Sequence, residues 1–290
     1  MQLWFVLAAM VVLLWGVDGI FAKLSTPKLG VARVAILIAV VDGIVYFLGF
    51  CYWRDNLPIS LEASVLAATS CIAGTIAYLC YFESIVDGQI AIAGTISAAY
   101  PALTVIGALV FLSETLTEAQ AMALVAIIGG LTTLSYEPNP GSEHAMPRRS
   151  LFFALLAFAL WGFWGLTSKM TINVVGPGNM FGFYTISSLA VPLVYTWFRR
   201  FRPERSGDCS PSWTAWTLGA MTLALNVCGV FGFSFALDVG YASLVVPISS
   251  AYPLVTVILA VALLHEKLDR LHVLALVFII IGLVVIGITG

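Results

Sequence analysis

Two aspartates lie inside stretches of sequence that are otherwise almost entirely apolar. Asp18 is three residues after Trp15 in the first stretch, and Asp42 lies near the middle of the second, in AVVDGIVYF. Ionisable groups in such segments are costly, so they usually face a bundle interior or a wet cavity. Each carboxylate could carry a coupling proton, face a cationic group of a bound molecule, or hydrogen-bond a neighbouring helix. For Glu83, late in the third stretch, the structural role is favoured.

Aromatic and small polar residues accompany these acids. Tryptophan and tyrosine rings in a cavity can stack on a ring or a cation, although in membrane helices they more often pack or mark the interface. The aromatic candidates are Trp15, Tyr78, Tyr81, Tyr100, Trp161, Trp164 and Tyr252, and the hydrogen-bonding candidates are Ser97, Asn226, Ser249 and Ser250. Lys23 and Lys169 stand at equivalent ends of two apolar stretches, where we expect their ammonium groups to snorkel toward water.

The elements that position these residues follow from the composition. Hydrophobic residues make up 61% of the chain and charged residues 10%, with a mean hydropathy of +1.02. The charges separate apolar blocks of roughly 18–25 residues, the length of a membrane-spanning helix. We therefore predict an all-α integral membrane protein with ten spans: Leu3–Ala22, Val31–Tyr52, Glu62–Val86, Ile90–Leu112, Ala119–Tyr136, Ser150–Ile172, Asn179–Phe198, Trp213–Asp238, Ala242–Leu264 and Leu271–Ile288.

The chain is a tandem duplication. Residues 88–134 align without a gap to residues 240–286, with about 20 of 47 positions identical. Upstream, Trp15-Gly16 corresponds to Trp161-Gly162. We predict a first repeat over 1–136, a polar linker over 137–149 and a second repeat over 150–290. Because each repeat has an odd number of spans, the second enters the membrane from the opposite side, which is typical of inverted-repeat transporters.

Tyr-Pro pairs occur at the same place in the fourth span of each repeat. Pro101 and Pro253 each remove a backbone donor, and we expect them to kink their helices and act as hinges rather than ligands. By contrast, Glu114 and Glu266, in the tight connections that follow, are expected to cap or pair there.

The orientation in the membrane is predicted from lysine and arginine placement. Eleven of these residues fall in odd-numbered connections, and two, Arg54 and Lys169, fall in even-numbered ones. This bias puts the odd connections in the cytoplasm and both termini outside, in a multi-pass protein of the inner membrane.

Several classes of chemistry find no support in the sequence. There is no Walker loop, dinucleotide fingerprint or nucleophile elbow. The five cysteines and three histidines form no ligand cluster, so we predict no metal site and no cofactor. No basic tract suggests nucleic acid. The expected partners are the bilayer and a small-molecule substrate, and a monomer is the expected oligomeric state.

The order of these features resembles the drug/metabolite transporter superfamily, and within it the ten-span EamA-type proteins. The shared features are two five-helix repeats, Trp-Gly in the first helix of each, proline in the fourth, glutamate just after it, and a glycine-bearing fifth helix. The resemblance implies a central cavity, lined mainly by the first, third and fourth helices of both repeats, and substrates such as amino acids, other small metabolites or drugs, often exported. The candidates above match that lining, whereas Asp42 is not part of the family pattern. Relatives are commonly drawn with cytoplasmic termini, against the charge count.

These observations favour a secondary transporter of a small, amino-acid-like metabolite, working by alternating access, with Asp18 or Asp42 as proton carriers. Extrusion of organic cations or drugs is the alternative within transport. A non-transporting scaffold or embedded enzyme is the alternative of another class. No catalytic set supports an enzyme, and a scaffold predicts both aspartates in sealed helix contacts without a cavity.

Overall fold

The computed structural model describes residues 2–87, 96–97, 99–134, 148–199, 210–264 and 270–289, and every element in these ranges is helical. The first-repeat elements are α1 (Leu3–Leu29), α2 (Val31–Leu37), the π-helix η1 (Ile38–Asp42), α3 (Gly43–Trp53), α4 (Leu61–Asp87), α6 (Tyr100–Phe111) and α7 (Glu118–Leu134). The second-repeat elements are α8 (Arg148–Val175), α9 (Pro177–Arg199), α10 (Trp213–Val239), α11 (Ala242–Ser249), α12 (Tyr252–Leu264) and α13 (Arg270–Thr289).

These elements form ten membrane spans. Eight stretches are long and apolar enough to cross a bilayer, and α6 and α7 are two shorter apolar helices. The second span is α2, η1 and α3 joined end to end, and its counterpart in the second repeat is α9. The all-α membrane fold of ten helices is therefore confirmed, whereas the predicted linker 137–149 lies mostly outside the described residues and the repeat boundaries stay a prediction.

The first span extends further than its apolar pattern predicts. Helix α1 ends at Leu29 rather than Ala22, with Pro27 inside its last turns. Gly30 terminates it with a φ of 76°, and Gly176, at the equivalent point of the second repeat, has a φ of 82°. Residues with a side chain rarely adopt this conformation, so glycine permits the sharp passage into the second span of each repeat.

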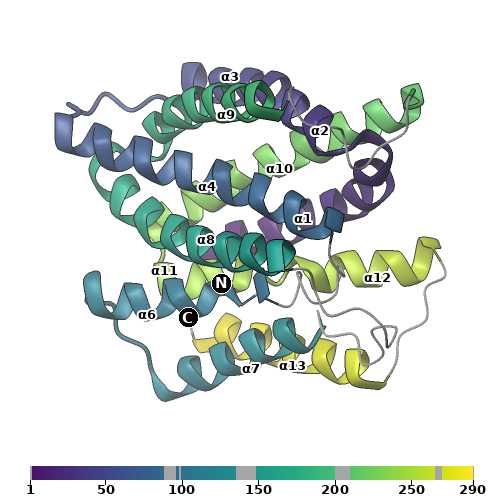
Figure 1. Cartoon of the computed structure of the whole chain (residues 1–290). Helices are drawn as coiled ribbons and strands as arrows, with labels where there is room; N and C mark the ends of the chain where they lie inside the picture. Colours follow the sequence, from purple (N-terminus) through teal and green to yellow (C-terminus); the bar gives the residue numbers. More distant parts are fainter. Residues whose placement is uncertain are drawn as a thin grey trace.

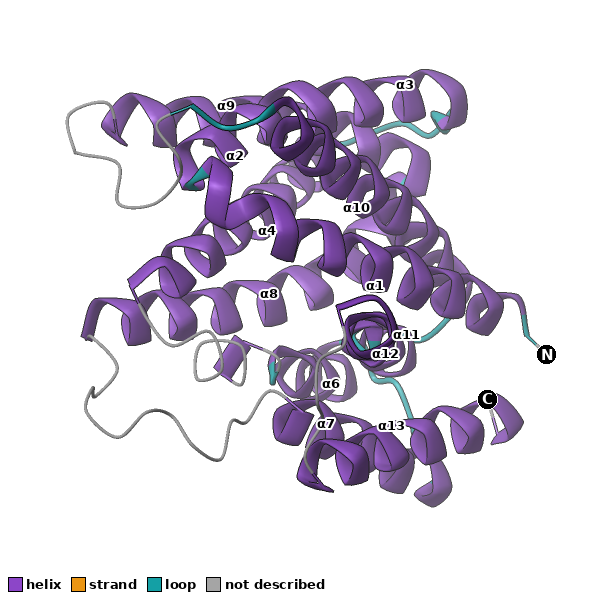
Figure 2. Ribbon diagram, turned by 90° about the vertical axis from the view of Figure 1, so that its right-hand side faces the viewer, coloured by secondary structure: helices purple, strands orange, loops and turns teal. Residues whose placement is uncertain are grey.

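The two repeats are interleaved rather than side by side. Helix α1 packs on α10 and α12, and its counterpart α8 packs on α4 and α6. In the same way α3 packs on α9, and α7 on α13 (Figures 1 and 2). Each pairing joins a span of one repeat to a span of the other, and exchanging the repeats reproduces the same set. The marked ends of the chain lie on the same side of the molecule (Figure 2), as an even number of spans requires.

Individual hydrogen bonds obey the same symmetry. Thr104 Oγ1 donates to the carbonyl of Gly162 at 3.0 Å, and Thr256 Oγ1 donates to the carbonyl of Gly16 at 2.9 Å. The threonines are equivalent in the repeat, and so are the glycines. The absence of a side chain on Gly16 and Gly162 lets the fourth span of the other repeat approach closely. The inverted duplication is thus reproduced at the level of single contacts.

The fourth span is broken rather than kinked. In the second repeat, α11 ends at Ser249 and α12 begins at Tyr252, with a tight turn between them in which Ala251 N donates to Ile248 O at 2.9 Å. The equivalent bond in the first repeat joins Ala99 N to Ile96 O at 3.4 Å. Each proline therefore lies in the first turn of a new helix, where its missing N–H costs no helical bond. The paired prolines thus mark a broken helix, as in inverted-repeat transporters, and each predicted kink is the start of a new helix.

A buried glutamate holds the start of the broken span. Both Glu114 carboxylate oxygens accept hydrogen bonds, from Ala242 N and Ser243 N, each at 2.8 Å. These N–H groups belong to the first turn of α11, which has no intrahelical acceptors for them. The predicted capping role of Glu114 is confirmed, and the cap ties the connection after α6 to the other repeat. Its counterpart Glu266 lies outside the described residues.

Candidate functional site

A cavity of about 650 Å³ lies between the two repeats. We call it the central cavity. Its walls come chiefly from α1, α4, α8, α10 and α12, with contributions from the second spans. The predicted residues that line it are Trp15, Asp18, Asp42, Tyr78, Tyr81, Ser97, Tyr100, Trp161, Trp164, Asn226, Ser250, Tyr252 and Pro253. Two predicted residues, Ser249 and Pro101, are not among its lining residues, although both are buried.

Asp18 is held by a partner from the other repeat. The side-chain Nδ2 of Asn226 donates to Asp18 Oδ2 at 3.1 Å, and the backbone carbonyl of Asn226 accepts from Trp15 Nε1 at 3.1 Å. Trp15 and Asp18 are successive on one face of α1, three residues apart. Trp15, Asp18 and Asn226 are thus joined by hydrogen bonds between α1 and α10. Asp18 is 7% exposed, and the amide fixes the direction in which its carboxylate points.

Asp42 reaches the cavity through an irregularity of the second span. The helix widens to a π-turn over Ile38–Asp42, and such bulges often occur at functional sites because they re-aim the side chains that follow. Asp42 is 6% exposed, and its buried Oδ1 atom has no hydrogen-bond partner among the described residues. Ser188, its counterpart in the second repeat, also lines the cavity. The repeat therefore keeps a polar group at this position on both sides.

Aromatic rings pack against one another at the Trp15 end of the central cavity. Phe233 stacks on Trp164 with ring centroids 5.0 Å apart and contacts Trp15 at 5.6 Å. Trp164 Nε1 donates to the Tyr184 hydroxyl at 2.7 Å, and Tyr184 stacks on Tyr46 at 5.0 Å. This run of rings crosses from one repeat to the other. From it the cavity extends along α1 from Trp15 to Pro27, toward the C-terminal end of that helix.

A second aromatic group covers the side walls. Trp161 lies between Tyr81 and Tyr100, with centroid distances of 5.4 and 5.7 Å. The Tyr100 hydroxyl accepts a hydrogen bond of 2.6 Å from Ser250 Oγ, which joins the fourth spans of the two repeats at their breaks. The breaks therefore lie at the cavity wall, where irregular backbone is tolerated in membrane proteins.

The charged groups of the lining are few. Among the described lining residues the acids are Asp18 and Asp42, and the base is Lys23. Lys23 is an exposed residue at this lining, which is compatible with the expectation that its ammonium group snorkels toward water. Its counterpart Lys169 donates instead to the backbone carbonyl of Leu237, between α8 and α10.

Sequence reasoning missed several lining residues. Those absent from the predicted set include Tyr46, Thr75, Tyr184, Ser188 and Thr256. Helical spacing could have found Tyr46, one turn after Asp42, and Thr256, one turn after Tyr252. The duplication could have found Ser188 through Asp42. No sequence signal marks Tyr184, which is brought in by packing between α3 and α9.

Comparison with known proteins decides the family. The model of the EamA-like transporter family matches residues 2–136 and 148–288. The chain belongs to the EamA-like transporter family. A solved crystal structure superposes with a TM-score of 0.78 over 99% of each chain at 17% identity, which shows the fold. An uncharacterized protein of Methanocaldococcus jannaschii is 36% identical over 74 residues, 26% of this chain, and the chain spans 54% of that relative's length.

Membership in the EamA-like family confirms the resemblance inferred from the sequence. It implies membrane transport of small molecules by a multi-pass membrane protein, in a family whose members are generally not enzymes. Its two matches correspond to the two interleaved repeats of the fold. The central cavity lies between these repeats and is lined by both aspartates, whereas a non-transporting scaffold predicted no cavity there.

Proposed function

We propose that this EamA-like protein is a secondary transporter that exports a small amine-bearing metabolite, amino-acid-like in character, across the inner membrane. The observation that carries the proposal is the pair of buried carboxylates in one aromatic-walled cavity. A carboxylate attracts an ammonium group, and aromatic faces add cation–π attraction at distances below about 6 Å. Buried acids in membrane helices mark substrate or proton pathways.

The two acids are suited to different roles. Asp18 is oriented by the Asn226 amide, and a fixed carboxylate suits recognition of a substrate ammonium group. Asp42 Oδ1 is buried and has no partner within the described part of the chain, and a carboxyl group in that position can hold a proton when no cation is bound. If Asp42 holds a proton in one half of the transport cycle and faces the charge of the bound amine in the other half, proton movement is coupled to amine movement.

An amino-acid-like substrate also needs a partner for its own carboxylate. Lys23 supplies the cationic group of the lining, toward the C-terminal end of α1. A ligand with opposite charges at its two ends would match the acids at one end and Lys23 at the other. For an organic cation, which is the second candidate, the aromatic walls and the acids suffice and Lys23 is not needed.

The direction of transport rests on the charge bias. If the odd-numbered connections are cytoplasmic, so is the end of α1 toward which the cavity extends. The aromatic run from Trp15 to Trp164 then seals the outer side. Such a state can load substrate from the cytoplasm, and rocking of the interleaved repeats would release it outside.

A thermal-shift screen of the detergent-purified protein tests this proposal. The panel contains amino acids, polyamines, organic cations, sugars and nucleotide sugars at several pH values. A ligand present at about 100 times its Kd stabilises the folded protein by roughly 2.7 kcal/mol, which is readily detected. We expect amine-bearing compounds to raise the melting temperature of wild type and not of Asp18→Asn. Asp238→Asn, at an exposed position outside the cavity, is the matched control and should respond like wild type.

The same panel separates the candidates. If amino acids bind wild type and lose affinity in Lys23→Met, the substrate is amino-acid-like. If organic cations bind both proteins equally, the second candidate holds. Stabilisation by sugars alone, unaffected by Asp18→Asn, would contradict an amine substrate altogether.

A further inference from the structure

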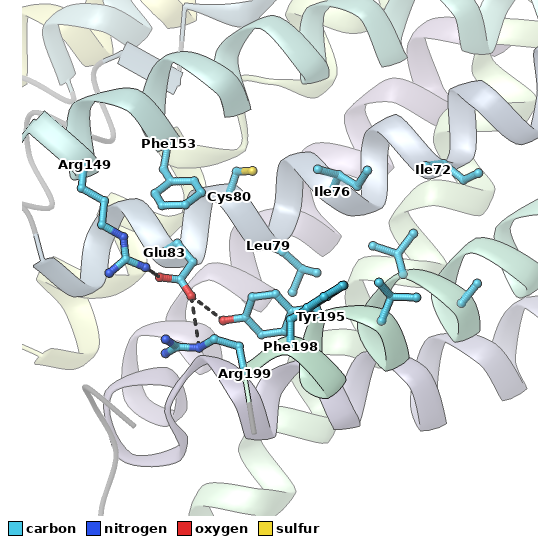
Figure 3. Close-up of a pocket in the computed structure, with 13 residues that line it drawn as sticks. Ile72, Ile76, Leu79, Cys80, Glu83, Arg149, Phe153, Tyr195, Phe198 and Arg199 are labelled. Atoms are coloured by element: carbon cyan, nitrogen blue, oxygen red, sulfur yellow. Dashed lines mark hydrogen bonds and ion pairs between the residues drawn. The ribbon is translucent and has the colours of Figure 1, made fainter. Parts of the chain in front are cut away.

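A second hollow of about 590 Å³ lies on the side of the molecule, between α4, α8 and α9 (Figure 3). We call it the lateral groove. Its walls are apolar side chains such as Ile72, Ile76 and Leu79 of α4 and Val194 and Phe198 of α9. Val194 is 56% and Phe198 67% exposed. In a membrane-spanning protein, exposed side chains at these positions of a span face lipid, so the groove opens to the bilayer.

The lateral groove is separate from the central cavity. The two share no lining residue. They occupy opposite faces of α4: Thr75, Tyr78 and Tyr81 face the central cavity, whereas Ile76 and Leu79 face the groove. Helical periodicity accounts for this division. A ligand in the groove would therefore contact neither Asp18 nor Asp42.

One end of the groove is polar. Glu83 accepts a hydrogen bond of 2.7 Å from Arg149 Nη2 and another from the Tyr195 hydroxyl, and Arg199 Nε lies 3.5 Å from Glu83 Oε1 (Figure 3). The Glu83 side chain is 5% exposed. Among the described residues of this cluster, two guanidinium groups face one carboxylate. Arg149 keeps 31% of its side chain exposed, so its charge is accessible from the groove's polar end.

The groove's length corresponds to one leaflet. Glu83 and Ile72 are separated by eleven positions of α4, which is about 16 Å at 1.5 Å per residue. Half of a hydrocarbon core of about 30 Å is close to that length. Arg149 stands at the start of α8 and Arg199 at the end of α9, which puts the polar end at the membrane surface. A basic end at the surface and an apolar track toward mid-membrane match an anionic lipid.

We propose that the lateral groove binds an anionic glycerophospholipid. Its phosphate lies at Arg149 and Arg199, and one acyl chain lies along Ile72, Ile76 and Val194. The Glu83 carboxylate holds the two arginines in place and does not contact the phosphate. Because α4 belongs to the first repeat and α8 and α9 to the second, the bound lipid bridges the two halves of the transporter.

The test uses delipidated full-length protein in detergent and native mass spectrometry, which counts bound lipids and gives an apparent Kd. The probes are phosphatidylglycerol, phosphatidylcholine with identical chains, and inorganic phosphate. A basic residue near an anionic lipid contributes roughly a fivefold gain in affinity, so wild type should prefer phosphatidylglycerol by at least about that factor. Arg149→Gln should lose the preference, whereas Arg270→Gln, on α13 away from the groove, should keep it.

The chain offers a matched pair for the acyl-chain track. Val194→Trp fills the groove, and Leu193→Trp adds the same ring to a neighbouring position that is 59% exposed and does not line it. We expect only Val194→Trp to weaken phosphatidylglycerol binding. The proposal would be overturned if the two tryptophan variants weakened lipid binding equally, or if wild type bound both lipids with equal affinity. It would also be overturned if inorganic phosphate alone bound as tightly as phosphatidylglycerol. Asp42→Asn should bind the lipid normally, so failure here is distinguishable from failure of the proposed transport function.

Discussion

At the scale of single residues, the two cavity acids differ in what holds them. Asp18 has an amide partner from α10, whereas a buried oxygen of Asp42 has none among the described residues. Their place inside the bundle could be predicted from the sequence, because a charged residue within a membrane span is too costly to face lipid. Their different partners were not readable, because Asn226 and Asp18 are 208 positions apart.

This difference predicts distinct phenotypes for the two asparagine variants. Asp18→Asn removes the charge that the substrate ammonium meets, so we expect its binding affinity to fall at least about tenfold, or roughly 1.4 kcal/mol. Asp42→Asn cannot exchange a proton, so it should keep binding but lose the dependence of binding on pH. Titration calorimetry at several pH values measures both. Identical behaviour of the two variants would contradict the division of roles.

The cap on α11 gives a second prediction at this scale. Glu114→Ala leaves two buried N–H groups without their acceptor, and loss of a cap costs about 0.5–2 kcal/mol. We expect a lower melting temperature in detergent. Glu118→Ala, an exposed glutamate four residues later in the first turn of α7, is the control and should melt like wild type. An unchanged melting temperature for Glu114→Ala would show that water replaces the cap.

At the scale of elements, the sequence predicted ten spans but not their irregularities. Helix α1 continues past Lys23 because polar side chains in a span end can line a cavity as readily as face water. The break before Tyr252 was expected as a kink, since proline alone does not distinguish a bent helix from a new one. The π-turn before Asp42 carries no glycine or proline to mark it.

The π-turn can be tested by deletion. Removing Val40, whose side chain is 51% exposed, takes out the extra residue of the π-turn, so Ile38–Asp42 should return to a regular helix and the Asp42 carboxylate should lose its present direction into the cavity. We expect a folded protein without pH-dependent ligand binding. Val40→Ala keeps the extra residue and should behave like wild type. Normal pH dependence in the deletion variant would exclude a role for the π-turn.

The fifth spans of the two repeats, α7 and α13, make a close contact that glycine substitutions can test. A Cβ on Gly130 would lie 2.6 Å from Ile279 Cγ1, and one on Gly282 would lie 2.6 Å from Ile127 Cγ1, so the contact is symmetric. Gly130→Ala should lower stability by about 1–3 kcal/mol through overpacking. Nothing lies within 4 Å of a Cβ on Gly129, so Gly129→Ala should be tolerated. Thermal unfolding of the two variants in one detergent compares them directly, and equal stability would argue against a tight α7–α13 contact.

At the scale of the whole molecule, the duplication was the strongest sequence signal and carried the fold. The odd number of spans per repeat implied inversion, and the exchanged pairings of α1 with α10 and α4 with α8 follow it. The cavity between the repeats was expected from the family resemblance, and most of the candidate residues line it. Ser249 was predicted to line the cavity but is not among its lining residues, because one step along a helix turns the side chain away, whereas its neighbour Ser250 lines the cavity. The lateral groove was not predicted, since apolar residues facing lipid and apolar residues facing a groove look alike in sequence.

The central claim is that the cavity acids couple proton movement to export of an amine. Flux in proteoliposomes tests it most directly: uptake of the best-binding amine is followed with and without a pH gradient, for wild type and the two asparagine variants. We predict gradient-driven accumulation by wild type and no flux by Asp18→Asn. Asp42→Asn should exchange the amine across the membrane yet fail to accumulate it. Wild-type accumulation by both variants would contradict the account.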